Sequence, residues 1–161
     1  MNIFEQAIGL KQEKEEYYRG LSKKCSSRGV RKLFSMLADE EAAHRKAIED
    51  LAAKIPAHLA QSTVLADAKI AFKEIIAEGF GSVCDAKQPE LYRKALAYEE
   101  RAEKFYLQKA QESQEEYQKG IFKRIAEEET KHRAVLQSVL DIVQRPERWL
   151  ENAEWYHVED Y

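Results

Sequence analysis

The feature that most constrains this chain is an internal repeat, because its first half returns 88 positions later without a gap. The matching pairs are Ala7 with Ala95, Glu15 with Glu103, Tyr18 with Tyr106, Phe34 with Phe122, Ala38 with Ala126, Glu40 with Glu128, Glu41 with Glu129, His44 with His132, and Arg45 with Arg133. A repeated unit that cannot bury its apolar face alone packs against its copy. The repeat therefore predicts two similar helical hairpins around one core and a pseudo-twofold axis.

Each copy of the repeat carries a glutamate and a histidine three positions apart, Glu41 with His44 and Glu129 with His132. Residues at this spacing share one face of a helix, so a carboxylate and an imidazole can converge on a single ion. In a glutamate-rich chain the spacing also arises by accident on solvated faces. Because the pair is duplicated together with its surroundings, we interpret it as a site that binds metal or descends from one that did.

The length and charge of the chain exclude several other classes of function. At 161 residues the chain is expected to form one domain, and its net charge of −3 with interspersed signs argues against nucleic-acid binding. No apolar run reaches membrane-spanning length, and the first 18 residues carry charges where a signal peptide needs an apolar core. The sequence therefore predicts a cytoplasmic protein with neither a nucleic-acid nor a membrane partner.

The two cysteines, Cys25 and Cys84, are widely separated in the sequence. This separation fits two reduced thiols better than a disulfide framework or a Cys-x-x-Cys metal site. We therefore expect free thiols, and no four-cysteine iron module.

Capping and breaking residues divide the chain into elements. Asn2, with Glu5 three positions later, predicts a helix that begins there and continues to about Ser26. We expect a tight reversal through Gly29, and a second helix that ends at Pro56. Along the apolar stripe of the first helix lie two lysines, Lys11 and Lys14, of which Lys11 is the more central. Such a lysine can also extend along the edge of an apolar stripe to reach water.

The segment between the two halves is long enough to return along the bundle rather than to form a short loop. Within it the sequence predicts a helix that is capped by Ser62 or Thr63 and ends at Gly79. The predicted core-facing residues of this helix are Leu65, Ile70, Phe72 and Ile76. We read His58 as a surface residue.

In the second half, Pro89 opens the third helix, the chain turns around Gly120, and Pro146 stops the fourth helix. The predicted segments are a first hairpin at 2–54, a crossover at 55–88, a second hairpin at 89–144 and a tail at 145–161. The tail holds both tryptophans and is expected to pack against the bundle or a second subunit. Its Glu154 and His157 share the metal-type spacing, but a packing role is expected for His157. The apolar surface of the tail and of the crossover helix predicts a homodimer.

These residues resemble the rubrerythrin branch of the ferritin-like diiron carboxylate proteins, over residues 3–55 and 91–144. In that family each half supplies a helix with Glu, six residues and Tyr, and a helix with Glu-x-x-His. The second half of this chain matches with Glu99, Tyr106, Glu129 and His132. The first half matches with Tyr18, Glu41 and His44. The resemblance implies an all-α, ferritin-like four-helix bundle of two antiparallel hairpins, with these glutamates and histidines as metal ligands and both tyrosines beside them.

The chain departs from the family at Lys11, where the first half should carry a glutamate. With only Glu41, Glu99 and Glu129 at the expected positions, two divalent ions would leave an excess positive charge in a low-dielectric core. The expectation is therefore one ion, or none with Lys11 paired to Glu99 or Glu129, while Glu15 is a possible substitute ligand.

Two functions follow from the resemblance and its departure. The first is a metal-dependent oxidoreductase that uses iron or manganese to act on peroxide or dioxygen. Zinc is a further candidate ion for the site. Rubrerythrins proper carry a rubredoxin-like four-cysteine domain, which is absent from this sequence, so a separate electron donor protein is implied. The alternative is a metal-binding or interaction protein whose site is altered by Lys11. In the extreme form of this alternative the site holds no metal.

Overall fold

The computed structural model describes residues 2–25, 27–78 and 89–144, and all regular structure in these ranges is helical. The helices are α1 (Ile3–Lys24), α2 (Arg28–Ala52), α3 (Val64–Glu78), α4 (Pro89–Glu112) and α5 (Glu116–Gln144). The predicted all-α fold is confirmed. The tail at 145–161 with His157, as well as Cys84 and Gly79, lies outside the described residues.

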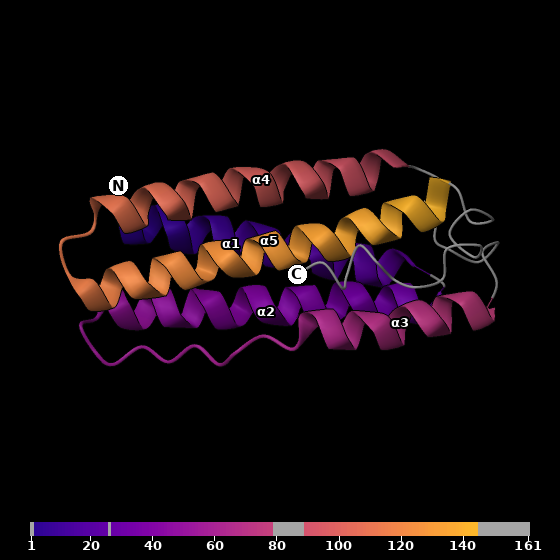
Figure 1. Ribbon diagram of the computed structural model, residues 1–161, viewed down its shortest axis with the longest axis horizontal. Coiled ribbons are helices and arrows are strands. Elements are labelled where there is room, and N and C mark those ends of the chain that lie inside the picture. The colour runs from indigo at the N-terminus through magenta and orange to yellow at the C-terminus, as the bar shows by residue number, and fades with distance from the viewer. Residues whose placement is uncertain (1, 26, 79–88, 145–161) are drawn as a thin grey trace.

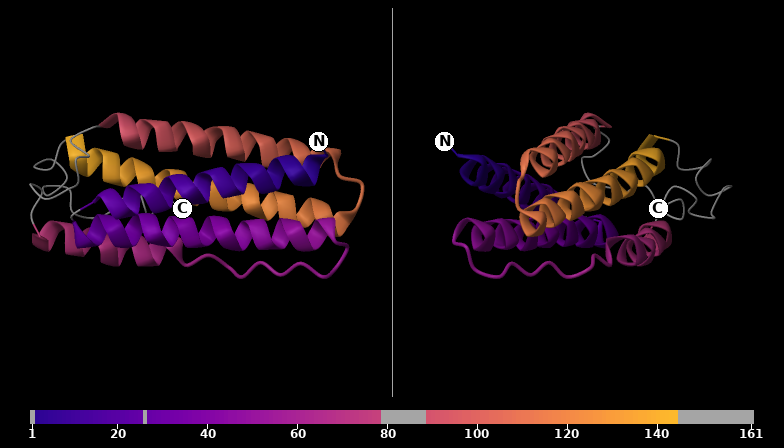
Figure 2. Two further views of the ribbon diagram at one scale, coloured as in Figure 1. Left: turned by 180° about the vertical axis from the view of Figure 1, so that it is seen from behind. Right: turned by 60° about the vertical axis from the view of Figure 1, so that its left-hand side comes forward.

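Four helices form the bundle, and α3 lies on its outside (Figure 1 and Figure 2). The most extensive packing is between α1 and α2 and between α4 and α5, whereas α1 and α4 touch at few points. The connection after α2 runs back along the bundle, and α3 then packs against α2 and α5. This is the predicted crossover, and it leaves the two hairpins to face one another across the core.

Local signals explain where the helices of the first hairpin begin. The Asn2 side chain accepts a hydrogen bond from the Glu5 backbone N–H, and the Glu5 carboxylate accepts one from the backbone of Asn2. This is the capping box that the sequence predicted. Ser27 caps α2 by accepting a hydrogen bond from the Val30 backbone N–H. Residue 54 ends the first hairpin with a φ of 57°, which is a left-handed conformation typical of a helix terminus.

Two glycines lie inside helices rather than in the turns where the sequence placed them. Gly29 is in the first turn of α2, where a Cβ would stand 2.6 Å from the Cγ1 of Ile75 and 2.7 Å from the carbonyl oxygen of Ala71. Its lack of a side chain lets α3 approach. Gly120 lies within α5, and the predicted turn there is wrong, because the chain reverses at residues 113–115. Ser113 marks this end by donating a hydrogen bond from its hydroxyl to the Lys109 carbonyl.

Two further expectations from the sequence are corrected by the structure. Ile70 does not face the core and is 55% exposed, because α3 packs through its other face. That buried face consists of Val64, Ala68, Ala71, Phe72 and Ile75. Cys25 is disulfide-bonded, so the expectation of a free thiol is wrong.

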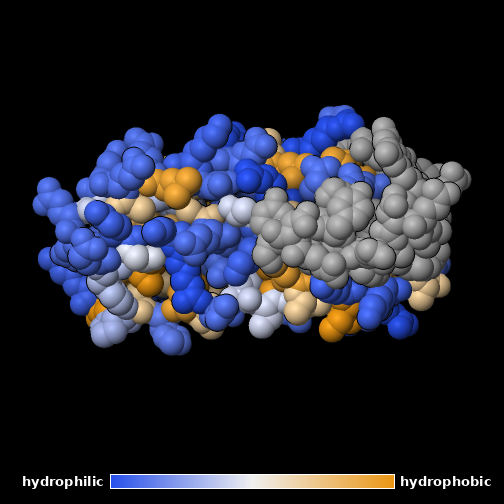
Figure 3. All heavy atoms as spheres, viewed as in Figure 1, coloured by the Kyte–Doolittle hydropathy of each residue, from blue (hydrophilic) through white to orange (hydrophobic). Residues whose placement is uncertain are grey.

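The core consists of two apolar clusters with a polar layer between them. One cluster contains Tyr18, Phe34 and the buried face of α3. The other contains Tyr106, Phe122 and Ile125. The visible surface in the view of Figure 1 is mostly hydrophilic, with hydrophobic residues scattered across it (Figure 3). None of the helices in the described ranges has the length and apolar run that a membrane crossing requires.

Candidate metal centre

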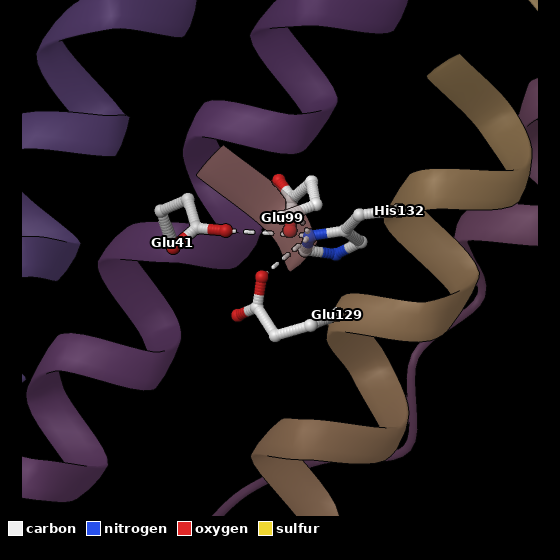
Figure 4. A group of neighbouring side chains, drawn as sticks. All are labelled: Glu41, Glu99, Glu129 and His132. Carbon is white, nitrogen blue, oxygen red and sulfur yellow. Dashed lines mark ion pairs between the residues drawn. The ribbon is translucent and has the colours of Figure 1, made fainter. Parts of the chain in front are cut away.

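The five residues that the sequence proposed as metal ligands all reach the polar layer of the core. Glu41 and His44 come from α2, Glu99 comes from α4, and Glu129 and His132 come from α5; each is at most 2% exposed. Figure 4 shows four of them, with the three carboxylates directed toward the ring of His132. The two hairpins therefore contribute to one cluster, as the pseudo-twofold arrangement predicted.

Four of these residues could hold a single ion. One ligand atom from each of Glu41, Glu99, Glu129 and His132 lies within 4.8 Å of the others. The Nδ1 atom of His132 lies 3.3 Å from Glu41 Oε1, 3.8 Å from Glu99 Oε1 and 4.0 Å from Glu129 Oε2. Carboxylate oxygens and imidazole nitrogen are donors that iron and manganese accept.

His44 faces the same cluster from beside His132. The two imidazole rings are stacked, with centroids 5.8 Å apart and planes 6° from parallel. The Nδ1 atom of His44 lies 2.9 Å from the Nζ atom of Lys11, and an ammonium can only donate, so Nδ1 accepts. Burial and the Lys11 charge lower the pKa of His44, which keeps the imidazole neutral.

Lys11 occupies the centre of the site rather than its edge. It is fully buried, and its Nζ atom lies 2.9 Å from Glu41 Oε2 and forms an ion pair with Glu129 Oε1. The same Nζ atom lies 4.9 Å from the centroid of the Tyr106 ring. Carboxylates, an imidazole nitrogen and an aromatic face therefore surround this ammonium.

Lys14 is a site residue that the sequence analysis did not assign. Its Nζ atom lies 3.0 Å from Glu41 Oε1 and 2.9 Å from Glu99 Oε2, and it forms an ion pair with Glu129 Oε2. The sequence feature that could have identified Lys14 is its position one helical turn after Lys11 on the same apolar stripe. Its partner in the repeat is the small residue Ala102, which leaves room for a long side chain.

The two ammonium groups bridge the same pair of carboxylates. Glu41 and Glu129 each direct one oxygen toward Lys11 and the other toward Lys14. Burial opposes charge on Lys14, but the surrounding carboxylates outweigh it and raise the lysine's pKa well above its usual value. Burial also opposes charge on Glu129, but the two ammonium groups hold its pKa well below its usual value. Both shifts favour an ionised cluster.

Glu99 is the carboxyl that most readily takes a proton. Burial and the neighbouring Glu129 carboxylate raise its pKa to about 7, against the opposing effect of Lys14. The hydroxyl of Tyr18 donates a hydrogen bond to Glu99 Oε1. Burial and Glu99 raise the pKa of Tyr18 well above its usual value, so the hydroxyl keeps its proton.

Tyr106 has a different environment from its repeat partner Tyr18. Its hydroxyl lies 3.5 Å from the carbonyl oxygen of Ala7, and its ring lies beneath Lys11. Both tyrosines are buried beside the cluster, as expected, but only Tyr18 contacts a carboxylate.

A partly buried contact orients His132. Its Nε2 atom lies 2.9 Å from Glu40 Oε1, and the hydroxyl of Ser62 donates to the same oxygen at 2.6 Å. Burial opposes a charged ring, but the neighbouring carboxylates of Glu40, Glu41 and Glu99 outweigh it and raise the pKa of His132 well above its usual value. A carboxylate at the outer nitrogen of a histidine is the arrangement that fixes ring orientation in metal sites. The matched repeat pair Glu40 and Glu128 was the signal for this contact.

Glu15 does not enter the cluster. Its carboxylate lies 2.7 Å from Arg45 Nη1 and is part of a surface ion pair. His58 is exposed, as expected.

The donor set fits one ion and not two. Both carboxylate oxygens of Glu41 are held by ion pairs with Lys11 and Lys14, whereas the buried Nδ1 atom of His132 has no hydrogen-bond partner. A buried ring nitrogen is usually hydrogen-bonded, so this nitrogen fits a donor to an ion. One ion fits these residues in exchange for Lys14. Two ions do not fit, because Lys11 and Lys14 lie between the carboxylates that would bridge them.

The fold and the buried cluster together define the class of a ferritin-like helical bundle whose buried glutamates and histidine could hold a metal ion. The rubrerythrin family model matches residues 90–159, which span the second hairpin and the tail. Over these residues, which are fewer than half of the chain, the sequence is similar to rubrerythrin, as the second half of the repeat predicted. The match and the cluster support a metal-binding protein of the diiron type. No curated protein and no solved structure matches the chain.

Proposed function

We propose that this chain is a non-haem iron or manganese oxidoreductase that acts on peroxide or dioxygen with electrons from a separate donor protein. The observation that carries the proposal is the buried set Glu41, Glu99, Glu129 and His132, with ligand atoms within 4.8 Å of one another. The rubrerythrin match supports the substrate class. A bound iron or manganese ion would supply the redox chemistry, which neither carboxylates nor imidazoles perform alone.

In this proposal the remaining residues position the ligands and keep water out. Glu40 holds the outer nitrogen of His132, which directs Nδ1 into the cluster. Tyr18 holds one oxygen of Glu99 and leaves the other directed inward. The apolar clusters above and below the polar layer separate it from solvent.

The test of the proposed function is metal content followed by turnover. Protein loaded with Fe²⁺ without oxygen is analysed for metal and then assayed for peroxide consumption with a chemical reductant. We expect bound iron and peroxide consumption, and we expect both to be lost in Glu129→Gln. The control Glu128→Gln removes the neighbouring carboxylate, which is outside the ligand set, and should retain both. Bound iron without peroxide or dioxygen turnover would contradict the enzyme while leaving metal binding intact.

A second candidate function is a metal-free bundle that acts through its surface. The observation that favours it is the pair of ammonium groups, because Lys11 and Lys14 already balance two of the three carboxylate charges. The absence of bound metal after anaerobic loading with Fe²⁺ and Mn²⁺ would establish this candidate and exclude the first.

We also propose one domain over residues 1–161, and a homodimer. The exposed apolar side chains Ile55, Ile70, Leu107 and Tyr117 support association. Light scattering at micromolar concentration should give twice the chain mass, and a monomer would contradict the dimer. The cytoplasmic location stays a prediction. The disulfide of Cys25 argues against it, because disulfides are rare in that compartment, and cell fractionation tests it.

A further inference from the structure

The two buried lysines differ in the space beside them. A cavity of about 290 Å³ lies between α1 and α4, and Lys14 lines it. Other lining residues are Leu10 and Glu13 on α1 and Tyr98, Arg101 and Ala102 on α4. Lys11 does not line this cavity and is fully buried, whereas Lys14 is 3% exposed. Lys14 therefore has room to move, and Lys11 does not.

The ammonium of Lys14 stands where a single ion would bind. It contacts one oxygen from each of Glu41, Glu99 and Glu129, and these three residues provide all the carboxylates of the four-residue ligand set. Two cations cannot share that position. An ion that enters must therefore displace Lys14, and the adjoining cavity is the space beside that side chain. Glu13, whose Oε1 accepts a hydrogen bond from the Tyr98 hydroxyl, is a carboxylate that lines this cavity.

The ammonium of Lys11 occupies a second, separate position. It contacts the other oxygens of Glu41 and Glu129, the Nδ1 atom of His44 and the ring of Tyr106. None of these contacts involves Glu99. An ion held by the four-residue set therefore leaves the immediate partners of Lys11 in place.

The charge of the cluster selects between one ion and two. Metal ligation requires all three carboxylates in the ionised form, which gives −3. One divalent ion together with the Lys11 ammonium balances this charge completely. Two divalent ions with both lysines displaced would leave +1 in a buried site, where an uncompensated charge is strongly disfavoured.

We propose that the site takes one divalent metal ion per chain, with Lys11 as the permanent cation in place of a second ion and Lys14 as a cation that moves into the α1–α4 cavity when the ion binds. The inference rests on the proposed function in one respect, because it requires that the chain binds metal. It adds the number of ions and the group that the ion displaces.

The test is a Mn²⁺ titration of the full chain, with equilibrium dialysis for the number of ions and electron paramagnetic resonance for their coupling. We expect one ion in the wild type, with the spectrum of an isolated Mn²⁺. In Lys14→Met no ammonium has to leave, so one ion should bind at least tenfold more tightly, which corresponds to about 1.4 kcal/mol. Lys14→Gln serves as a second variant if the methionine protein does not fold.

The matched control is Lys109→Met. Lys109 is a half-buried lysine that pairs with Glu112 at the end of α4, and its loss should leave the affinity for Mn²⁺ unchanged. Two ions in the wild type, or the spectrum of a coupled pair, would overturn the role of Lys11. Equal affinity in the wild type, Lys14→Met and the control would overturn the displacement of Lys14. If no variant binds Mn²⁺ or anaerobic Fe²⁺, the proposed function fails together with the inference.

Discussion

Replacing Lys11 by glutamate reverses the charge at the position where the first half of the repeat lacks the glutamate that the second half carries as Glu99. In the metal-free protein Lys11→Glu removes the ammonium that pairs with Glu41 and Glu129. It also brings a fourth carboxyl group into their immediate surroundings. Because all these groups are fully buried, water cannot compensate for the change. The metal-free variant should therefore be less stable than the wild type.

The size of the effect follows from the burial. Removing one partner of a buried ion pair costs about 3–5 kcal/mol. The added carboxyl group can avoid part of the repulsion by taking a proton, so we retain this range. For a chain of this length each kcal/mol corresponds to roughly 2–4 °C in melting temperature, which predicts a fall of roughly 6–20 °C.

Metal should reverse this loss, because four carboxylates balance two divalent ions once Lys14 has moved. Free Mn²⁺ at about 100 times its dissociation constant would return about 2.7 kcal/mol. Calorimetric melting with and without Mn²⁺, together with metal analysis, measures both effects. The control Lys46→Glu makes the same substitution at an exposed pair with Asp50 and should melt close to the wild type. An unchanged melting temperature for metal-free Lys11→Glu, or a stoichiometry still at one ion, would refute the reasoning.

Three further outcomes follow from the structure. Tyr18→Phe removes a hydrogen bond to a buried carboxylate and should lower the free energy of unfolding in urea by about 1.5–3 kcal/mol. The control Tyr17→Phe removes a hydrogen bond to a backbone carbonyl and should lower it by about 0.5–1.5 kcal/mol. Equal losses would contradict the hydrogen bond from Tyr18 to Glu99. Gly29→Ala should lower the free energy of unfolding by about 1–3 kcal/mol, because the added methyl group forces α2 away from α3. Gly9→Ala, with no atom near the added Cβ, should raise it by about 0.4–1 kcal/mol. A gain at both positions would show that α2 and α3 are not in close contact at Gly29. Although burial opposes the ionised form of Glu129, two ammonium groups hold its pKa well below 4.5. The stability that this carboxylate contributes is therefore present above pH 4.5 and is lost as the pH falls below it. A urea midpoint that stays the same when the pH is lowered from about 5 to about 3 would contradict the ion pairs.

The repeat carried more information than the sequence analysis took from it. Lys24 and Glu112 end the first helix of each hairpin, Arg28 and Glu116 begin the second, and each of these pairs is 88 positions apart. The offset from the first turn gives 113–115 for the second, whereas the sequence analysis placed that turn at Gly120. The prediction at Gly120 was wrong because glycine was treated as a turn residue, although an exposed glycine within a long helix costs only about 1 kcal/mol.

The cluster was predicted from spacing, but its balance of charge was not. Periodicity placed Lys11 on the inward stripe together with the glutamates. Lys14 and its repeat partner Ala102 line the same cavity between the two hairpins, and such a juxtaposition is not visible along one helix. The Glu40 contact with His132 likewise joins α2 to α5. The disulfide at Cys25 could not be predicted, because wide separation in sequence does not determine separation in space.

The surface ion pair between Glu15 and Arg45 has a counterpart between Glu103 and Arg133, and the arginine and carboxylate atoms are 2.7 Å apart in both. Each pair joins the two helices of its own hairpin without touching the core cluster. Both copies of the repeat carry this ion pair, whereas the residue that faces the cluster is Lys11 in one copy and Glu99 in the other. The contact that joins the helices of a hairpin is thus independent of the charge at the centre, and the central residue of one copy can differ without loss of that contact.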